Sequence, residues 1–480
     1  MNWKVITRYI GISLLLVASL MTLSGIVAYF TPGDKSSLPL FFSSFVTGIV
    51  GIYPFIFVRK SSFVLTFREG NTILVGAWFL SCLFGMLPFL FYGGEFTFVN
   101  AFFESVSGFT TTGASVLNDI ESLPRGIQFW RISTAWVGGI GILTLFSMIT
   151  GKAAKCALSK AEISTIARET LGGMHSNSFA NRMIVTYIVL TFITFLSLKF
   201  TGLCWFDAAT NAMSACSTCG FCTKNTSIAF YENPAAEVIL TIAMLAAAIN
   251  FVLLFLAVFK GGFRCVLKSE TIKAFLSLVG LAIVIVTIDL LLHGGYSSLW
   301  TALRDSSFQV ASISTTTGFA TADTASWPPL SMSVLIICSL ACGCSGSTSG
   351  GFKIDRAILA FKDIHRKITI RLTPNAVRFV KVDGRIRTDE QVGDALGFIF
   401  LYMLIVLFFA AVNCAFGQDF TTGLTASIAC VGNVGPGFGD VGSMTNYASF
   451  PEVLKITSML EMLIGRLEIF PILYLLRLRT

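Results

Sequence analysis

Ten apolar stretches alternate with short polar segments along this chain of 480 residues. A helix that crosses a bilayer needs about 20 mainly apolar residues, because each residue adds only about 1.5 Å to its length. The pattern therefore predicts ten transmembrane helices. They cover residues 10–30, 38–58, 71–92, 129–150, 183–202, 236–259, 274–292, 330–352, 395–416 and 453–476.

The first apolar stretch follows Lys4 and Arg8, as in a secretory signal peptide. Its apolar run is too long for a signal peptide and no small-residue cleavage site follows, so we expect an uncleaved helix. Most of the 34 Lys and Arg fall in segments that are cytoplasmic if the N-terminus is cytoplasmic. Because basic residues mark cytoplasmic loops, we expect both termini inside the cell.

The composition fits a membrane protein with many helices. Hydrophobic residues make up 54% of the chain and charged residues 12%, against about 25% charged in soluble domains. The net charge of +8 follows from the basic inner segments, so it does not indicate nucleic-acid binding. We therefore expect an all-α polytopic fold.

Four polar segments share one pattern and recur about one hundred residues apart, which indicates an internal repeat. Each contains a glycine, with a small residue six positions earlier and a helix-capping residue type thirteen positions earlier. The pattern predicts a capped helix, too short to cross the membrane, that leads into a glycine turn. The glycines are Gly113, Gly220, Gly318 and Gly435, the small residues Ser107, Ser214, Ser312 and Ala429, and the expected caps Asn100, Asp207, Asp305 and Thr422.

These segments predict four pseudo-repeated helix–pore loop–helix units around one central pore, after two extra N-terminal transmembrane helices. Non-helical backbone at membrane depth is tolerated only where protein buries it or where it lines an aqueous cavity, so the four loops should meet. The predicted parts are an N-terminal pair at 1–70 and pore units at 71–182, 183–273, 274–392 and 393–480. The third unit also holds an intramembrane loop and a basic cytoplasmic loop.

The residue types in the four loops favour binding of a monovalent cation by backbone carbonyl groups, since no ring of carboxylates is present. Glycine adopts the positive φ angle that lets successive carbonyls point the same way. The negative ends of the short helix dipoles also favour cations. The candidate ion-binding residues are Thr111, Thr112, Gly113, Thr218, Cys219, Gly220, Thr316, Thr317, Gly318, Asn433, Val434 and Gly435.

The eighth apolar stretch ends in a run of glycine and hydroxyl residues that is a poor helix former. It is either the flexible cytoplasmic exit of an ordinary helix or an intramembrane loop that blocks the pore.

Arg466 lies inside the last stretch, where it either faces the pore or ties helices together. Glu104 is either a structural acid or an ion ligand. The candidate gating residues are Gly343, Ser345, Gly346, Ser347, Thr348, Ser349, Gly350, Gly351 and Arg466.

Two other kinds of chemistry deserve comparison with ion transport. Cys216, Cys219 and Cys222 form a C-x-x-C-x-x-C pattern, but no fourth ligand has a matching spacing, so we expect no transition metal. Ser345 in the sequence GCSG resembles a hydrolase nucleophile, which needs a nearby base. His175, His293 and His365 are the three histidines, and none is expected at the right depth. We therefore do not expect an enzyme.

Several motifs together resemble the Trk/Ktr/HKT superfamily, and within it the TrkH/TrkG potassium-uptake proteins. They are FESVSGFTTTGAS at 103–115, STTTGFATAD at 314–323, CSGSTSGGFKIDR at 344–356, GNVGPGFGD at 432–440 and MLIGRLEIFPIL at 462–473. The likeness covers nearly the whole chain. It departs from the family at Cys219, where bacterial relatives often have glycine, which puts the local filter geometry in question.

The resemblance implies potassium uptake across a bacterial plasma membrane, the inner membrane, by a homodimer. It also implies that the 343–351 loop lies beneath the filter and contacts Arg466. The potassium ion is then the substrate and the chain carries no cofactor. The basic segment from Lys353 to Arg387 either reflects topology or docks a cytosolic nucleotide-binding subunit of the TrkA type. A sodium or mixed monovalent cation transporter is the main alternative, and an intramembrane serine hydrolase a remote one.

Overall fold

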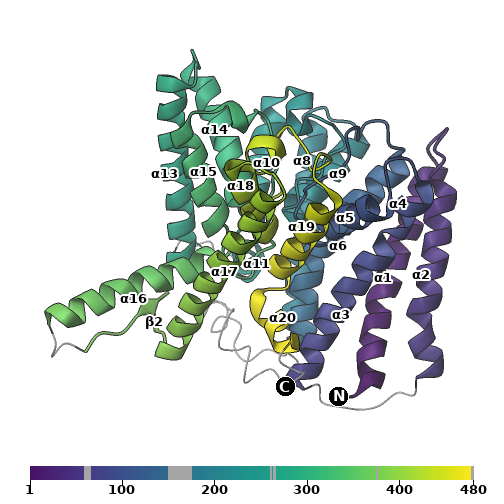
Figure 1. Cartoon of the computed structure of the whole chain (residues 1–480), viewed down its shortest axis with the longest axis horizontal. Coiled ribbons are helices and arrows are strands. Elements are labelled where there is room, and N and C mark those ends of the chain that lie inside the picture. The colour runs from purple at the N-terminus through teal and green to yellow at the C-terminus, as the bar shows by residue number, and fades with distance from the viewer. Residues whose placement is uncertain are drawn as a thin grey trace.

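The computed structural model is built almost entirely of helices, which confirms the predicted all-α polytopic fold (Figure 1). It describes residues 1–58, 66–149, 176–259, 262, 266, 268–373 and 377–476. Within these residues, six helices are long and apolar enough to cross a membrane, and a bent helix pair makes a seventh if it counts as one span.

The first two helices pack side by side at one edge of the bundle (Figure 1). They are α1 (Trp3–Tyr29) and α2 (Ser37–Phe57). Glycines permit this close approach, because a methyl group at Gly11 of α1 would lie 2.7 Å from the carbonyl oxygen of Gly51 in α2. The pair adds to one side of the bundle, where α1 also contacts α3 and α6.

The remaining helices are described in four groups along the chain. The first group is α3 (Phe67–Gly85), α4 (Leu87–Tyr92), α5 (Phe98–Phe109) and α6 (Arg125–Ile149). The second is α8 (Ser176–Phe200), α9 (Trp205–Ser217), α10 (Pro234–Ala247) and α11 (Phe251–Phe259). The third is α13 (Glu270–His293), α14 (Leu299–Ser314), α15 (Pro329–Ala341) and α16 (Ile354–Leu372), and the last α17 (Asp389–Ala415), α18 (Phe420–Gly432), α19 (Glu452–Arg466) and α20 (Ile469–Leu476).

Short elements connect these helices. Three short 3₁₀ helices follow the glycine segments, at Ser227–Tyr231, Thr324–Ser326 and Gly439–Val441. A two-residue antiparallel pair, β1 (Lys381–Val382) with β2 (Arg385–Ile386), lies beyond α16. The helix α16 extends away from the bundle at its lower left (Figure 1). Helix α1 begins and α20 ends at the same lower end of the bundle (Figure 1).

Two predicted spans are wrong as continuous helices, and a third breaks close to the run of glycine and hydroxyl residues noted in its sequence. Residues 236–259 form α10 and α11, which meet at an angle of 110°. The 330–352 stretch is helical only to Ala341, and the 453–476 stretch breaks between α19 and α20, where Glu468 has a φ of 60°. Apolar composition indicates that a segment is buried or lies in the membrane. It does not show whether other parts of the chain offer the polar partners that stabilise a break in a helix.

The predicted caps of the short helices are also wrong, by one helical turn in three cases. The N-cap residues are Thr97 for α5, Cys204 for α9 and Asp419 for α18, and each accepts a bond from the amide of the residue predicted as the cap. Ser298 precedes α14 without a side-chain bond. The short helices accordingly have 12 to 16 residues, or roughly 18–24 Å.

Candidate functional site

The four short helices, α5, α9, α14 and α18, end in the same backbone conformation. The second residue before each glycine has a left-handed φ, with 55° at Thr111, 55° at Thr218, 58° at Thr316 and 53° at Asn433. This conformation costs a residue with a Cβ atom roughly 1–2 kcal/mol, and β-branched residues adopt it rarely. Four corresponding positions therefore hold a strained turn, three of them with threonine.

Hydrogen bonds define each turn as a Schellman helix end. In the first, the Thr111 amide donates to Gly108 (2.8 Å) and the Thr112 amide to Ser107 (2.9 Å). The same pair of bonds recurs in the other three segments, where the small residues Ser214, Ser312 and Ala429 accept. The small residue six positions before each glycine thus supplies the carbonyl that closes the helix.

The glycine two residues further along also has a positive φ in all four segments. The values are 80° at Gly113, 83° at Gly220, 82° at Gly318 and 96° at Gly435. Cys219 is not among the residues with positive φ, so a cysteine causes no backbone conflict at this position. The strained positions flank it, at Thr218 and Gly220.

The four segments lie against one another in cyclic order. A methyl group at Gly113 would lie 1.7 Å from the carbonyl oxygen of Cys219, and one at Gly220 would lie 2.1 Å from that of Thr317. A methyl group at Gly318 would lie 2.4 Å from the Val434 oxygen, and one at Gly435 would lie 2.6 Å from the Thr112 oxygen, which closes the ring. Only glycine permits this approach.

The oxygens of this ring come from the residues just before the glycines. In the described part of the chain, no hydrogen-bond donor reaches the carbonyl oxygens of Thr112, Cys219, Thr317 or Val434. A buried carbonyl normally has a partner. Four neighbouring carbonyls without a protein donor can therefore replace the water around a monovalent cation.

A buried ion pair braces the first segment against the second. Glu104 on α5 accepts from Ser115 Oγ (2.7 Å), from the Val116 amide (2.8 Å) and from Arg131 Nε on α6 (2.7 Å). Arg131 also donates to the Cys222 carbonyl (3.3 Å), and its guanidinium lies over the Phe221 ring. Since these donors engage both of its oxygens, Glu104 acts as a structural acid behind the ring.

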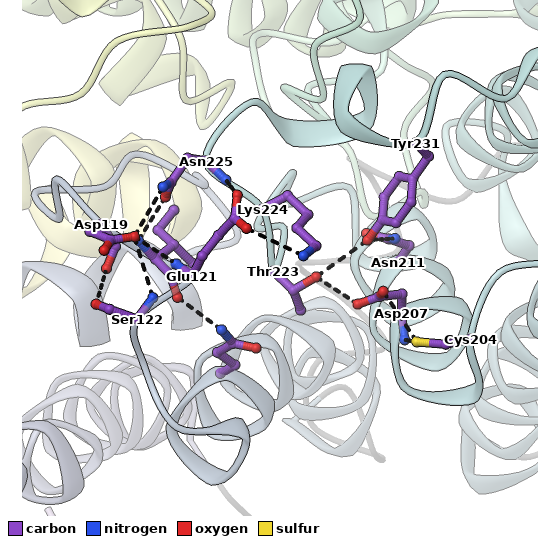
Figure 2. Close-up of polar contacts among 12 residues, drawn as sticks. Asp119, Glu121, Ser122, Cys204, Asp207, Asn211, Thr223, Lys224, Asn225 and Tyr231 are labelled. Atoms are coloured by element: carbon purple, nitrogen blue, oxygen red, sulfur yellow. Dashed lines mark hydrogen bonds and ion pairs between the residues drawn. The ribbon is translucent and has the colours of Figure 1, made fainter.

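Figure 2 shows the loops that follow Gly113 and Gly220 joined by polar contacts. The Asn225 side chain donates to Asp119 (3.0 Å) and accepts from the Ile120 amide (2.7 Å). The hydrogen bond from Asn225 lowers the pKa of Asp119 below its ordinary value of 3.8. Lys224 Nζ lies 3.3 Å from the Glu121 carboxylate. The loops beyond the ring thus form one connected surface.

The candidate gating segment lies between α15 and α16 and is not an exposed exit from a helix. Most of its residues from Gly343 to Gly350 are buried, and Thr348 is 0% exposed. Its far end touches the ring segments, because the Gly350 amide donates to Thr316 Oγ1 (2.9 Å) and the Gly351 amide to the Gly432 carbonyl (3.0 Å). The segment therefore lies directly behind two of the four turns.

Arg466, the last residue of α19, reaches this segment. Its Nη1 donates to the Thr348 carbonyl (2.7 Å) and its Nη2 to the Gly138 carbonyl on α6 (3.2 Å). The residue is 4% exposed and forms no ion pair with any carboxylate that the structure describes. A buried cation held only by carbonyl oxygens is costly and is retained where charge has a use.

The described residues form neither a transition-metal site nor a serine hydrolase site. No group of three or more His, Cys, Asp or Glu side chains there could hold a metal ion. The thiol of Cys219 packs with Ile132, Ala135 and Phe221. His293 contacts Asp289 at the end of α13, His365 lies on α16, and His175 lies outside the described residues.

Sequence reasoning missed two residues that hold these segments, Arg131 and Asn250. Asn250 stands between α10 and α11 and donates to the Ser345 carbonyl (2.7 Å). Both are polar residues within apolar stretches of the sequence, and such residues usually have a specific partner. The sequence does not show which segment provides that partner.

Residues 40–479 match the family described as TrkH, cation transport protein. The Trk system potassium uptake protein TrkH of Salmonella typhimurium is 32% identical and aligns with 99% of this chain and 98% of its own length. TrkG of Escherichia coli is 31% identical, with 98% and 97% aligned. The crystal structure of the potassium transporter TrkH from Vibrio parahaemolyticus has 30% identity, covers 99% of each chain and has a TM-score of 0.88.

Proposed function

The chain belongs to the TrkH family of cation transport proteins, and from this premise we propose that it takes up potassium through the ring of carbonyl groups. Family members are transporters rather than enzymes, which leaves no role for the serine hydrolase alternative. The relatives named above are potassium uptake proteins, and they align over nearly the full length of both chains. The potassium ion is the substrate, and no cofactor is required for a passive ring of carbonyls.

The observation that carries this proposal is the cyclic contact between glycines and carbonyl oxygens. Each glycine has a positive φ and each lies against the carbonyl oxygen that precedes the next glycine. Such a ring offers a cation partly desolvated oxygen ligands without fixed negative charge. We assign potassium binding to the turn residues predicted from the sequence, from Thr111–Gly113, Thr218–Gly220, Thr316–Gly318 and Asn433–Gly435.

A sodium or mixed cation transporter has the same fold and differs only in ring geometry. Uptake assays in a potassium-deficient bacterial host separate these alternatives. We expect the chain to rescue growth at low external potassium and to accumulate rubidium tracer, with sodium competing weakly. Equal competition by sodium would support the mixed transporter, and the absence of rubidium uptake at normal membrane expression would overturn the proposal.

We further propose that the segment from Gly343 to Gly351 is a gate that Arg466 helps to hold closed. The support is the bond from Arg466 to the Thr348 carbonyl and the burial of the segment behind the ring. A positive charge there also repels cations that have passed the ring. Arg466→Ala and deletion of 346–350 should each raise rubidium uptake, and the double variant should show less than the sum of their effects because both alter one contact.

Arg8→Ala provides the matched control for this gate. Arg8 also donates to a backbone carbonyl, that of Val58 (2.7 Å), but it lies in the N-terminal helix pair. Its loss should leave uptake at the wild-type level at equal membrane expression. If both gate variants abolish uptake, or if their effects simply add, Arg466 is a structural tie between helices and the gate proposal fails.

The arrangement of the protein in the cell completes the proposal. We propose a multi-pass protein of the bacterial inner membrane with both termini in the cytoplasm and with the unit boundaries predicted from the sequence. We also propose a homodimer regulated by a cytosolic TrkA-type subunit, docked at the basic segment between Lys353 and Arg387. The support for this last step is the extension of α16, with exposed basic residues such as Lys367, beyond the bundle (Figure 1).

A further inference from the structure

Two of the transmembrane spans are interrupted, and their interruptions bind one another. One lies between α10 and α11, at residues 248–250, and the other is the Gly343–Gly351 segment between α15 and α16. Each interruption leaves helix-end amides and carbonyls without partners in their own helices. In a bilayer such groups must find partners within the protein.

Four hydrogen bonds connect the two interruptions. At the end of α10, the Ala247 carbonyl accepts from Thr348 Oγ1 (3.2 Å) and the Ala248 carbonyl from the Cys344 amide (2.9 Å). At the start of α11, the Phe251 amide donates to the Gly346 carbonyl (3.1 Å). Asn250 Nδ2 donates to the Ser345 carbonyl (2.7 Å).

Asn250 serves both sides of this contact. Its Oδ1 accepts from the Val252 and Leu253 amides at the start of α11 (3.0 and 3.3 Å), which makes it the N-cap of that helix. Its Nδ2 holds the Ser345 carbonyl. Close packing adds to this, because a methyl group at Gly346 would lie 2.5 Å from Asn250 Nδ2.

We infer that the break between α10 and α11 is the lock of the proposed gate, with Asn250 as its positioning residue. This inference rests on the proposed function, since a lock presupposes that the 343–351 segment moves. Moving that segment removes the partners of the Ala247 and Ala248 carbonyls and of the Phe251 amide. Water must then replace them, so opening of the lock and hydration of the space behind the ring occur together.

A serine at position 250 distinguishes the two functions of Asn250, because it can cap α11 but cannot bond to Ser345. Asn250→Ser keeps a side-chain oxygen that can cap α11 but is too short to hold Ser345. Thr348→Val removes the hydroxyl, whose single hydrogen is shared between the carbonyls of Ala247 (3.2 Å) and Cys216 (3.1 Å), and leaves the Thr348 carbonyl available to Arg466. Asn413→Ser is the matched control, because Asn413 is also buried and donates to a backbone carbonyl, that of Gly423 (3.0 Å), away from the gate.

Two measurements on the full chain test the lock. The first is rubidium uptake in cells at equal membrane expression. The second is modification of Cys344, 2% exposed, by a charged thiol reagent in purified protein, with Cys430 as the buried internal control. Since one hydrogen bond contributes about 0.5–1.5 kcal/mol, each lock variant should raise both readouts roughly two- to twelvefold, and Asn413→Ser should change neither.

The outcomes distinguish the lock from the gate. If Arg466→Ala raises uptake while Asn250→Ser and Thr348→Val leave Cys344 protected, the segment gates but the lock inference is wrong. If the lock variants expose Cys344 while neither they nor Arg466→Ala raise uptake, the four hydrogen bonds hold the segment in place, but the gate proposal fails and with it the role of these bonds in gating. If Asn250→Ser does not fold, Thr348→Val decides the question, because it leaves the cap of α11 intact.

Discussion

Replacing Gly113 by alanine, compared with the same change at Gly93, distinguishes the effect of disturbing the ring of carbonyls from the effect of backbone strain alone. Gly113 and Gly93 have the same φ of 80°, but nothing lies within 4 Å of a methyl group at Gly93. Both substitutions place an alanine at a positive φ, which costs about 1–3 kcal/mol, and the ψ of −147° at Gly93 lies in a region that residues other than glycine rarely adopt. Only Gly113→Ala also places a methyl group against a neighbouring loop. The difference in ion selectivity between the two variants therefore measures the contribution of the ring.

The structure provides the size of this effect. The added methyl group would lie 1.7 Å from the Cys219 oxygen, and real contacts essentially never fall below 3.0 Å, so that oxygen must move by about 1.3 Å. At Gly435 the corresponding distance is 2.6 Å, and a shift of about 0.4 Å suffices. The disturbance should therefore decrease in the order Gly113, Gly220, Gly318, Gly435.

We expect the ratio of potassium to sodium uptake to fall in the same order. A loss of about 1.4 kcal/mol in preferential binding of potassium lowers that ratio tenfold, and we expect at least this loss for Gly113→Ala. Rubidium uptake is measured against increasing sodium in a potassium-deficient host. Gly93→Ala should retain the wild-type ratio at equal membrane expression.

The result that would refute this reasoning is an unchanged ratio in Gly113→Ala with normal expression. An equal effect of Gly93→Ala would also refute it, because strain alone would then account for the change. A larger loss at Gly435 than at Gly113 would contradict the distances between the loops, and with them the ring as the source of selectivity.

Three further predictions concern the surroundings of the ring. Glu104→Gln leaves the buried Arg131 without its carboxylate, which should destabilise the protein by about 3–5 kcal/mol; an unchanged thermal midpoint in detergent would show that the ion pair is not a brace. Cys219→Ala should retain potassium uptake with no stoichiometric iron or zinc in the purified protein, whereas joint loss of metal and uptake would restore the metal hypothesis. Asn225→Ala should raise the pKa of Asp119; because the pKa of that group is lowered in the folded protein, its stabilisation is present above about pH 3.8 and lost as pH falls through the lower folded value. The variant should therefore be less stable than wild type near neutral pH, and the difference should shrink as the pH falls below about 3.8 to the part that comes from the lost bond of the Ile120 amide; a constant difference across this range in thermal unfolding would contradict the assignment.

The positions of the turns could be predicted from the sequence because they depend on short segments. Apolar stretches of about 20 residues indicate spans, and a glycine after a small residue indicates a helix end with positive φ. The same local reasoning misplaced three of the caps by one turn, as in α5, where Thr97 and Asn100 are both suitable capping types. The length and residue types of a segment predict that a helix forms there. They do not decide which of two nearby capping residues begins it.

Tertiary structure alone decided how the segments meet. The contact of Gly113 with the Cys219 carbonyl, the bond from Arg466 to Thr348 and the bond from Asn250 to Ser345 each join parts of the chain more than 90 residues apart. The sequence shows that a buried charge or a broken helix needs a partner, because unsatisfied polar groups are costly in a bilayer. Many carbonyls could serve as that partner, and only the packing of the helices brings one of them within bonding distance.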